Sequence, residues 1–200
     1  MARSLVGHYL GAVSGGALYR KASFLLDSVG TRVFPDWFDI DELPFLPRGL
    51  RSAAFDAEGV ATQESPLVRD GIVQRYVLGS YSARKLGLAT TANAGGVHNL
   101  QVKANAGDLE SMLHGMGRGL LVTELMGHGV NAITGDYSRG AAGFWVEGGR
   151  IAYPVDGITI AGNLKSMFGA IEAVGADIDP RSHVRMGSML LGRMTVAGTG

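Results

Sequence analysis

The feature that most constrains the fold is a glycine-rich stretch, residues 117–162, in which short apolar runs alternate with turn residues. Three of these runs have the length and the β-branched or aromatic content typical of strands, namely residues 119–125, 143–147 and 150–155. Gly148-Gly149 separates the last two runs and predicts a tight hairpin, because both turn positions take a positive φ. Pro154 lacks a backbone N–H, so its strand should lie at a sheet edge or contain a bulge. The stretch predicts an antiparallel sheet whose first strand is buried.

The rest of the chain alternates between short strands and helices. Further strands are predicted at residues 72–78, 100–102 and 184–194. Helices are predicted at residues 4–13, within 17–29, at 80–87 as a helix or turn, at 109–116 and at 164–174. Ser14-Gly15-Gly16 should end the first helix, Asp108 and Asn163 should cap the last two, and Gly175 should end the final one. Residues 33–47 contain three prolines and are expected to be extended and irregular.

Composition indicates the fold class. The 31 glycines in 200 residues are about twice the usual ~7%. Charged residues make up 18% of the chain, below the typical ~25%, which favours a turn-rich protein with much buried surface. We expect an α+β fold of mainly antiparallel β-sheets with glycine-rich loops and a few packed helices. We assign residues 1–200 to a single domain.

Charge and cysteine content narrow the classes of function. Lys plus Arg equal Asp plus Glu at 18 each, and this balance argues against a nucleic-acid-binding domain, which usually carries a basic excess. The chain has no cysteine, which excludes disulfides and thiolate metal sites. No apolar run approaches the roughly 20 residues of a membrane-spanning helix. We recognise no secretory signal, so the sequence predicts a cytoplasmic protein with neither a nucleic acid nor a membrane as partner.

Residue patterns alone yield no complete catalytic set. The five histidines show no metal-ligand spacing; they are His8, His98, His114, His128 and His183. Asp56 and Glu58 share one face of an extended segment, where they form an acid pair, a cation site or simply two turn acids. Glu124 lies in an apolar run and, if buried, needs a partner such as Arg139 or Arg84.

Several long runs of this chain closely resemble the TldD/PmbA family, and the resemblance covers nearly the whole sequence. These runs are LYRKASFLLDSVG (residues 18–30), FDAEGVAT (55–62), SYSARKLG (80–87), NAGGVHN (93–99) and GLLVTELMGHGVNAITGDYSRGAAGFWVEGGRIAYPVDGITIAGNL (119–164). The resemblance implies a cytoplasmic assembly with zinc metalloprotease activity that cleaves unfolded peptides in a protected cavity. It also implies that the chain corresponds to the C-terminal portion of family members, whose long N-terminal portion is absent here.

The resemblance further implies that TldD-type members bind zinc through HExxxH on a helix and a downstream cysteine. Residues 6–11 of this chain occupy the corresponding positions, with Val6 and Gly11 at the two ligand positions and Gly7 at that of the general base. His8 is one step away from the ligand positions and is interpreted as a helix-surface residue. Since the cysteine also has no counterpart, we expect no metal or catalytic residue in this chain, as in PmbA-type (TldE-type) members.

Three functional hypotheses follow. The first is a non-catalytic subunit that works with a zinc-bearing TldD-type partner, or as a homo-oligomer, and helps form the cavity that binds unfolded peptides. Its candidate contacts lie in glycine-rich loops, unless those glycines serve only tight turns, and are His98, Asn99, His128, Asn131 and Arg139. The second is an independently active metallopeptidase with ligands from His98, His128 and a carboxylate. The third is a binding module that modulates DNA gyrase.

Overall fold

A computed structural model describes residues 1–198 and shows an α+β protein. Its helices are α1 (Ala2–Ala12), α2 (Gly15–Tyr19), α3 (Ser80–Leu86), α4 (Leu109–Met116) and α5 (Leu164–Gly169). Its longer strands are β2 (Ser65–Arg69), β5 (Gly119–Met126), β6 (Asp136–Glu147), β7 (Arg150–Asn163) and β8 (Ile171–Val174). Its short strands are β1 (Ile40–Glu42), β3 (Ile72–Val73), β4 (Leu100–Val102), β9 (Val184–Arg185), β10 (Met189–Leu191) and β11 (Thr195–Ala197).

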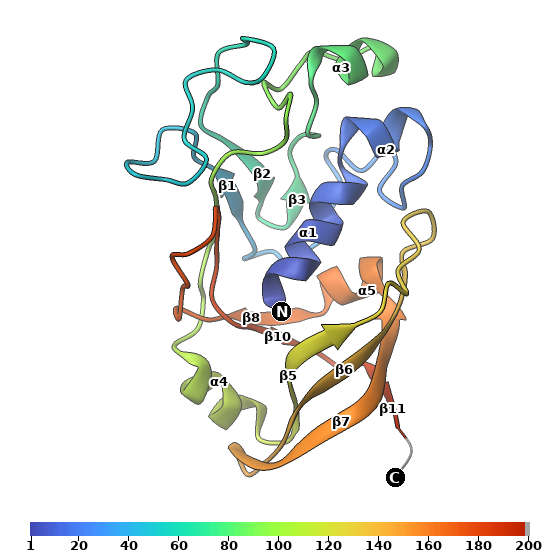
Figure 1. Cartoon of the computed structure of the whole chain (residues 1–200), viewed down its shortest axis with the longest axis vertical. Coiled ribbons are helices and arrows are strands. Elements are labelled where there is room, and N and C mark those ends of the chain that lie inside the picture. The colour runs from blue at the N-terminus through green and yellow to red at the C-terminus, as the bar shows by residue number, and fades with distance from the viewer. Residues whose placement is uncertain (199–200) are drawn as a thin grey trace.

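The strands form three sheets, and every described pair is antiparallel except β4–β9. The five-stranded sheet has the order β3-β2-β1-β4-β9, the four-stranded sheet the order β11-β7-β6-β5, and β10 pairs with β8. Figure 1 shows β1–β3 in the upper half and β5, β6, β7 and β11 in the lower half, with α1 passing across the middle. The expected fold class is confirmed.

One hydrophobic core joins the two halves through α1 and α5. Along α1, Leu5, Val6 and Tyr9 are buried, as expected from their spacing on one helical face. The Tyr9 ring meets Phe34 edge to face at 5.1 Å, and Phe34 stacks on Phe168 of α5 at a centroid distance of 5.0 Å. Such aromatic pairs bury large apolar surfaces and prefer these geometries, so they hold α1 against α5 and against the segment that precedes β1.

Several element boundaries differ from the predictions. The first helix ends at Ala12, just before Ser14-Gly15-Gly16, as expected. Ser14 also caps a second helix, α2, through its side-chain oxygen, and residues 21–30 form turns rather than a helix. The strand predicted at 72–78 is only β3, and residues 33–47 contain β1, a central strand. The helix predicted at 164–174 ends at Gly169, because Ile171–Val174 pairs with β10 as β8. The caps Asp108 and Asn163 are confirmed.

The lower sheet follows the glycine-rich stretch as predicted, with one exception. Gly148 and Gly149 form the β6–β7 turn with φ of +56° and +74°. Pro154 lies where no described strand pairs with the second side of β7. β5 was predicted to be buried, yet it is an edge strand whose residues are half-buried or exposed. An edge strand has a neighbour on one side only, which accounts for this exposure.

Candidate functional site

Residues 6–11, to which the family resemblance assigns the zinc-motif positions, lie on helix α1 and offer no metal ligand at those positions. The side chain of Val6 is 3% exposed and belongs to the core, whereas Gly7 and Gly11 offer no side chain at all. Within residues 1–198, no group of three or more His, Cys, Asp or Glu side chains is placed to hold a metal ion. The residues present therefore do not fit a catalytic zinc ion.

His8 was interpreted as a helix-surface residue, but it is half-buried against the lower sheet. Its ring meets the Tyr137 ring of β6 edge to face at 5.9 Å. Burial, together with the positive charge of Arg139, lowers the pKa of His8. Its Nε2 atom is buried and has no hydrogen-bond partner within the described residues. His8 thus packs as a neutral ring.

The β5–β6 loop, residues 127–135, carries two of the predicted contact residues on its surface. His128 and Asn131 are exposed, although the Asn131 carboxamide oxygen accepts hydrogen bonds from the backbone N–H groups of Ile133 and Thr134. Arg139, on β6, is half-buried and donates to the carbonyl oxygens of Leu125 and Met126 at 3.3 Å each. These three residues therefore lie around the same end of β5.

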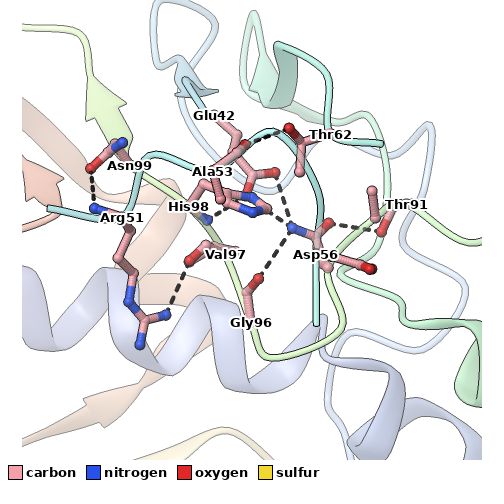
Figure 2. A network of polar contacts seen from close by, with 12 residues as sticks. Glu42, Arg51, Ala53, Asp56, Thr62, Thr91, Gly96, Val97, His98 and Asn99 are labelled. Carbon is pink, nitrogen blue, oxygen red and sulfur yellow. Dashed lines mark hydrogen bonds and ion pairs between the residues drawn. The ribbon is translucent and has the colours of Figure 1, made fainter. Parts of the chain in front are cut away.

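The other two predicted contact residues are buried in a polar cluster of the upper half (Figure 2). Asn99 is 1% exposed and donates to the carbonyl oxygen of Leu43 and to Ser52. His98 is 8% exposed and lies against the carboxylate of Glu42. Both side chains join separate chain segments, so in this structure a peptide has no direct access to them. Of the five predicted peptide contacts, this leaves His128 and Asn131 in the β5–β6 loop and Arg139 on β6.

His98 belongs to a group of contacts centred on Glu42, which does not include Asn99 and which we call the Glu42 cluster: Glu42, Arg75, Asn93 and His98. The Glu42 side chain is 2% exposed and forms an ion pair with Arg75. It also accepts hydrogen bonds from Asn93 Nδ2 at 2.9 Å and from the His98 backbone N–H at 2.6 Å, and His98 Nδ1 lies 3.0 Å away. A buried carboxylate needs such partners. The sequence analysis missed Glu42, Arg75 and Asn93.

Asp56 and Glu58 are turn acids rather than an acid pair. Asp56 accepts hydrogen bonds from the backbone N–H groups of Glu58, Val60 and Ala94 at 2.9–3.0 Å. Burial alone would raise the pKa of Asp56, but these three bonds outweigh it and hold that pKa below its usual value. Glu58 instead accepts from the backbone N–H of Ser80 at 2.7 Å. The two carboxylates stabilise different backbone segments.

Glu124 was predicted to be buried and paired with Arg139 or Arg84, and the structure shows neither. Its side chain is exposed on the edge strand β5, and no ion pair within residues 1–198 includes it. Arg139 contacts backbone carbonyls instead, and Arg84 is exposed on α3. Val122 and Leu125, the apolar neighbours of Glu124, pack against the hydrophobic core instead.

A groove of about 760 Å³ opens between α4 and β5, and we call it the α4–β5 groove. Its other walls are the first turn of α1 and residues 186–194. Figure 1 shows α4 beside β5, with the start of α1 and β10 above them. Arg118 lies over the Trp145 ring at 5.5 Å on the α4 side. This volume is in the range of ligand-binding pockets.

Comparison with known proteins places the chain in a family of peptidases. The family model described as the PmbA/TldA metallopeptidase C-terminal domain matches residues 1–198, and the chain belongs to this family. The chain is 56% identical over 198 residues to the metalloprotease PmbA of Escherichia coli O157:H7, a match that covers 99% of this chain and 44% of that protein. It is 54% identical over 199 residues to a PmbA homolog of Haemophilus influenzae, again covering 44% of the relative.

Solved structures share the fold. A Bacteroides thetaiotaomicron protein described as a proposed modulator of DNA gyrase matches with a TM-score of 0.94 and 29% identity, over 98% of this chain and 45% of its own. TldE from Thermococcus kodakarensis matches with a TM-score of 0.82 and 25% identity, over 94% of this chain and 46% of its own. The chain therefore spans less than half the length of these relatives. None of the helices described here has the length and apolarity needed to cross a membrane.

Proposed function

We propose that this chain acts as part of a non-catalytic subunit, of the PmbA/TldE type, in a TldD/PmbA metalloprotease assembly. In this role it helps form the cavity that holds unfolded peptides, while a TldD-type partner supplies zinc and catalysis. The assembly would be cytoplasmic. Within the cavity, the exposed loop residues His128 and Asn131, with Arg139 beside them, are the candidate contacts of this chain.

The observation that carries this proposal is the helix α1. Its positions for metal ligands and general base hold Val6, Gly7 and Gly11, none of which can bind zinc or move a proton. A zinc peptidase needs ligands that hold the metal and a group that activates its water. The same family contains TldD homologs, one of them described as a zinc metalloprotease, with which this chain shares 25% identity over 158 residues. An assembly of a catalytic TldD-type subunit and a non-catalytic PmbA-type subunit accounts both for the missing ligands in α1 and for the likeness to a zinc metalloprotease.

The first experiment measures zinc in the purified chain after dialysis against metal-free buffer. We expect far less than one zinc per chain, because no described side-chain cluster fits the ion. Near-stoichiometric zinc, with chelator-sensitive peptide cleavage by the chain alone, would overturn the proposal and support an independent metallopeptidase.

The second experiment mixes the chain with a TldD-type protein that carries HExxxH and follows cleavage of an unfolded peptide. We expect cleavage to increase over the partner alone, and to vanish when the glutamate of the partner's HExxxH is replaced by glutamine. His128→Ala should reduce the increase, whereas His114→Ala, at an exposed histidine of α4, is the matched control. No increase over the partner alone contradicts a subunit role.

A further inference from the structure

Two tyrosines meet on the surface of the upper half, where α2 contacts α3. The ring of Tyr19, at the end of α2, meets the ring of Tyr81 on α3 edge to face, with the ring centres 5.8 Å apart. The helices approach closely because Gly15 of α2 has no side chain, and a Cβ there would overlap Ser82. Figure 1 shows α2 and α3 next to each other in the upper half, at the other end of the molecule from α4. Tyr81 is 55% exposed and Tyr19 is half-buried, so the pair is accessible from outside.

Each of these tyrosines has a cation over its ring. The guanidinium of Arg20 lies 5.4 Å from the centre of the Tyr19 ring, and the ammonium group of Lys85 lies 5.7 Å from the centre of the Tyr81 ring. The negative face of an aromatic ring attracts a cation, so both long side chains have a preferred position on the surface. A side chain that is already ordered loses less conformational freedom when it binds a partner.

Two further cations complete a basic and aromatic surface, which we call the α2–α3 patch: Tyr19, Arg20, Lys21, Tyr81, Arg84 and Lys85. Lys21 follows Arg20 directly, and Arg84 lies three residues after Tyr81, on the same face of α3. All four cationic side chains are exposed. The net charge of the whole chain is zero, so this concentration of positive charge creates a local field that attracts anions.

Acidic side chains of the protein do not neutralise the patch. Within residues 1–198, no ion pair includes a cation of the α2–α3 patch. The carboxylate of Glu58 lies near Arg84, but it accepts a hydrogen bond from the backbone N–H of Ser80 at 2.7 Å. Arg84 and Lys85 lie in the last turn of α3, where the carbonyl groups favour cations. This position stabilises the helix but provides no carboxylate, so an anion from outside can pair with these charges.

The geometry of the rings distinguishes between two kinds of anionic partner. Single-stranded nucleic acids bind to aromatic side chains on which successive bases stack. Here Arg20 and Lys85 each lie over a ring face, and the two rings are inclined at 84° to each other, so they do not form a pair of parallel platforms for bases. The exposed N–H donors instead match carboxylates, which a guanidinium binds through two parallel hydrogen bonds. The patch therefore fits an acidic polypeptide better than a nucleic acid.

We propose that the α2–α3 patch binds an acidic segment of a partner protein, whose carboxylates pair with the four cations while the tyrosine rings hold Arg20 and Lys85 in position. One exposed ion pair contributes little by itself, so the segment must present several acidic side chains that bind together. The inference goes beyond the proposed function, because it requires neither zinc nor a TldD-type partner.

The test measures binding of the full chain to a short, fluorescently labelled peptide of alternating glutamate and serine, by fluorescence anisotropy. The same peptide with glutamine in place of glutamate is the control. We expect the glutamate peptide to bind and the glutamine peptide not to bind. The affinity should fall several-fold when the salt concentration rises from about 50 to about 300 mM, because salt screens exposed charges. Equal affinity for the two peptides, no binding of either, or an affinity that does not depend on salt would overturn the proposal.

Variants with matched changes in charge locate the binding site. Arg84→Glu combined with Lys85→Glu should weaken binding of the glutamate peptide by about tenfold or more, because two attractions become repulsions. Arg150→Glu combined with Lys165→Glu, at exposed positions on β7 and α5, changes the net charge equally and should bind like the parent chain. Equal weakening in both double variants would show an effect of net charge alone and would overturn the proposal.

A second double variant keeps the test decisive if the first one fails to fold, which circular dichroism shows. Arg20→Glu combined with Lys21→Glu changes the charge at the end of α2 and leaves α3 intact. We expect it to weaken binding of the glutamate peptide to a similar extent. Binding at the affinity of the parent chain would contradict a site that includes both helices.

Further measurements separate the role of the rings from that of the charges. Tyr81→Phe keeps a ring under Lys85 and should bind the glutamate peptide like the parent chain. Tyr81→Leu removes the ring and should weaken binding by about twofold to fivefold; unchanged binding would contradict the role of the ring. A single-stranded DNA oligonucleotide should bind more weakly than the glutamate peptide at the same salt concentration. Tighter binding of the DNA would overturn the proposal in favour of a nucleic-acid partner.

Discussion

The Glu42 cluster in the upper half and the α4–β5 groove in the lower half hold chain segments by opposite means. In the cluster, a carboxylate that is 2% exposed has a directed hydrogen bond or ion pair to each neighbour. The groove is instead lined by flexible thioether side chains from separate segments, those of Met1, Met112, Met116, Met167, Met186, Met189 and Met194. Directed polar contacts permit one arrangement, whereas methionine contacts permit many. A rigid upper half can therefore support a lower half whose surface adapts.

The largest loss of stability is expected when the charge of Glu42 is removed, because this takes away the central partner of the Glu42 cluster. We expect Glu42→Gln to lower the free energy of unfolding by about 3–5 kcal/mol, because it leaves the guanidinium of Arg75, whose side chain is only 16% exposed, without its charged partner. Urea unfolding followed by circular dichroism measures the loss. Adding Arg75→Gln should recover part of it, since the unpaired charge is then gone. A loss below about 1 kcal/mol would mean that the cluster carries little stability.

Substitution of one hairpin glycine in each of the two larger sheets should change the free energy of unfolding by a smaller amount. Gly71, in the β2–β3 turn, has φ of +73°, and a Cβ there would lie 2.3 Å from the carbonyl oxygen of Phe34. Gly148, in the β6–β7 turn, has φ of +56° with nothing within 4 Å. We expect Gly71→Ala to cost about 2–4 kcal/mol and Gly148→Ala about 1 kcal/mol, from strain alone. Thermal unfolding of both variants checks the order, and equal losses would contradict it.

Acid should affect the two halves in separate pH ranges. Because folding lowers the pKa of His8, its contribution is present above its ordinary value of 6.5 and is lost as pH falls below it. Asp56 also has a lowered pKa, so its contribution is lost only on further acidification, below about pH 4. His8→Gln should flatten the stability profile between pH 7 and about pH 5, and His128→Gln, at an exposed site, should not. Identical profiles for both variants would rule out His8 as the cause.

The smallest effect is expected for volume-conserving changes in the groove. Met116→Leu and Met194→Leu should change the free energy of unfolding by less than about 1.5 kcal/mol, because leucine fills nearly the same space. Urea unfolding of both variants measures the change, and a loss well above this value would contradict the expectation.

Local patterns in the sequence identified much of the lower sheet but little of the polar cluster. The Gly148-Gly149 turn, the caps Asp108 and Asn163, and the buried face of α1 follow from neighbouring residues, and all are confirmed. The family relationship, carried by long motifs, is confirmed as well. Such features are set by residues that lie close together in the sequence, so they can be predicted without knowledge of the fold.

The wrong predictions arose where distant pairing decides the outcome. Ile171 and Val174 fit helical spacing, yet pairing with β10 makes them part of a strand. Glu42 lies in a proline-rich segment that reads as irregular, but β2 and β4 pair on either side of it. Glu124 was predicted to be buried because its neighbours are apolar, and only the sheet order reveals that β5 is an edge. The gathering of methionines in the groove is likewise invisible until the chain is folded.

The parallel pairing of β4 with β9 has a consequence for how the protein forms. Leu100 pairs with Val184, so the five-stranded sheet cannot be complete until Val184, 84 residues further along the chain, has been synthesised. Contacts that close such long loops slow folding, and proteins rich in them fold on the order of milliseconds to seconds. Until β9 has been synthesised, the edge of β4 that pairs with it stays open on the ribosome-bound chain. We therefore expect the five-stranded sheet to form only after β9 has been synthesised. A chain truncated before Val184 should be prone to aggregation.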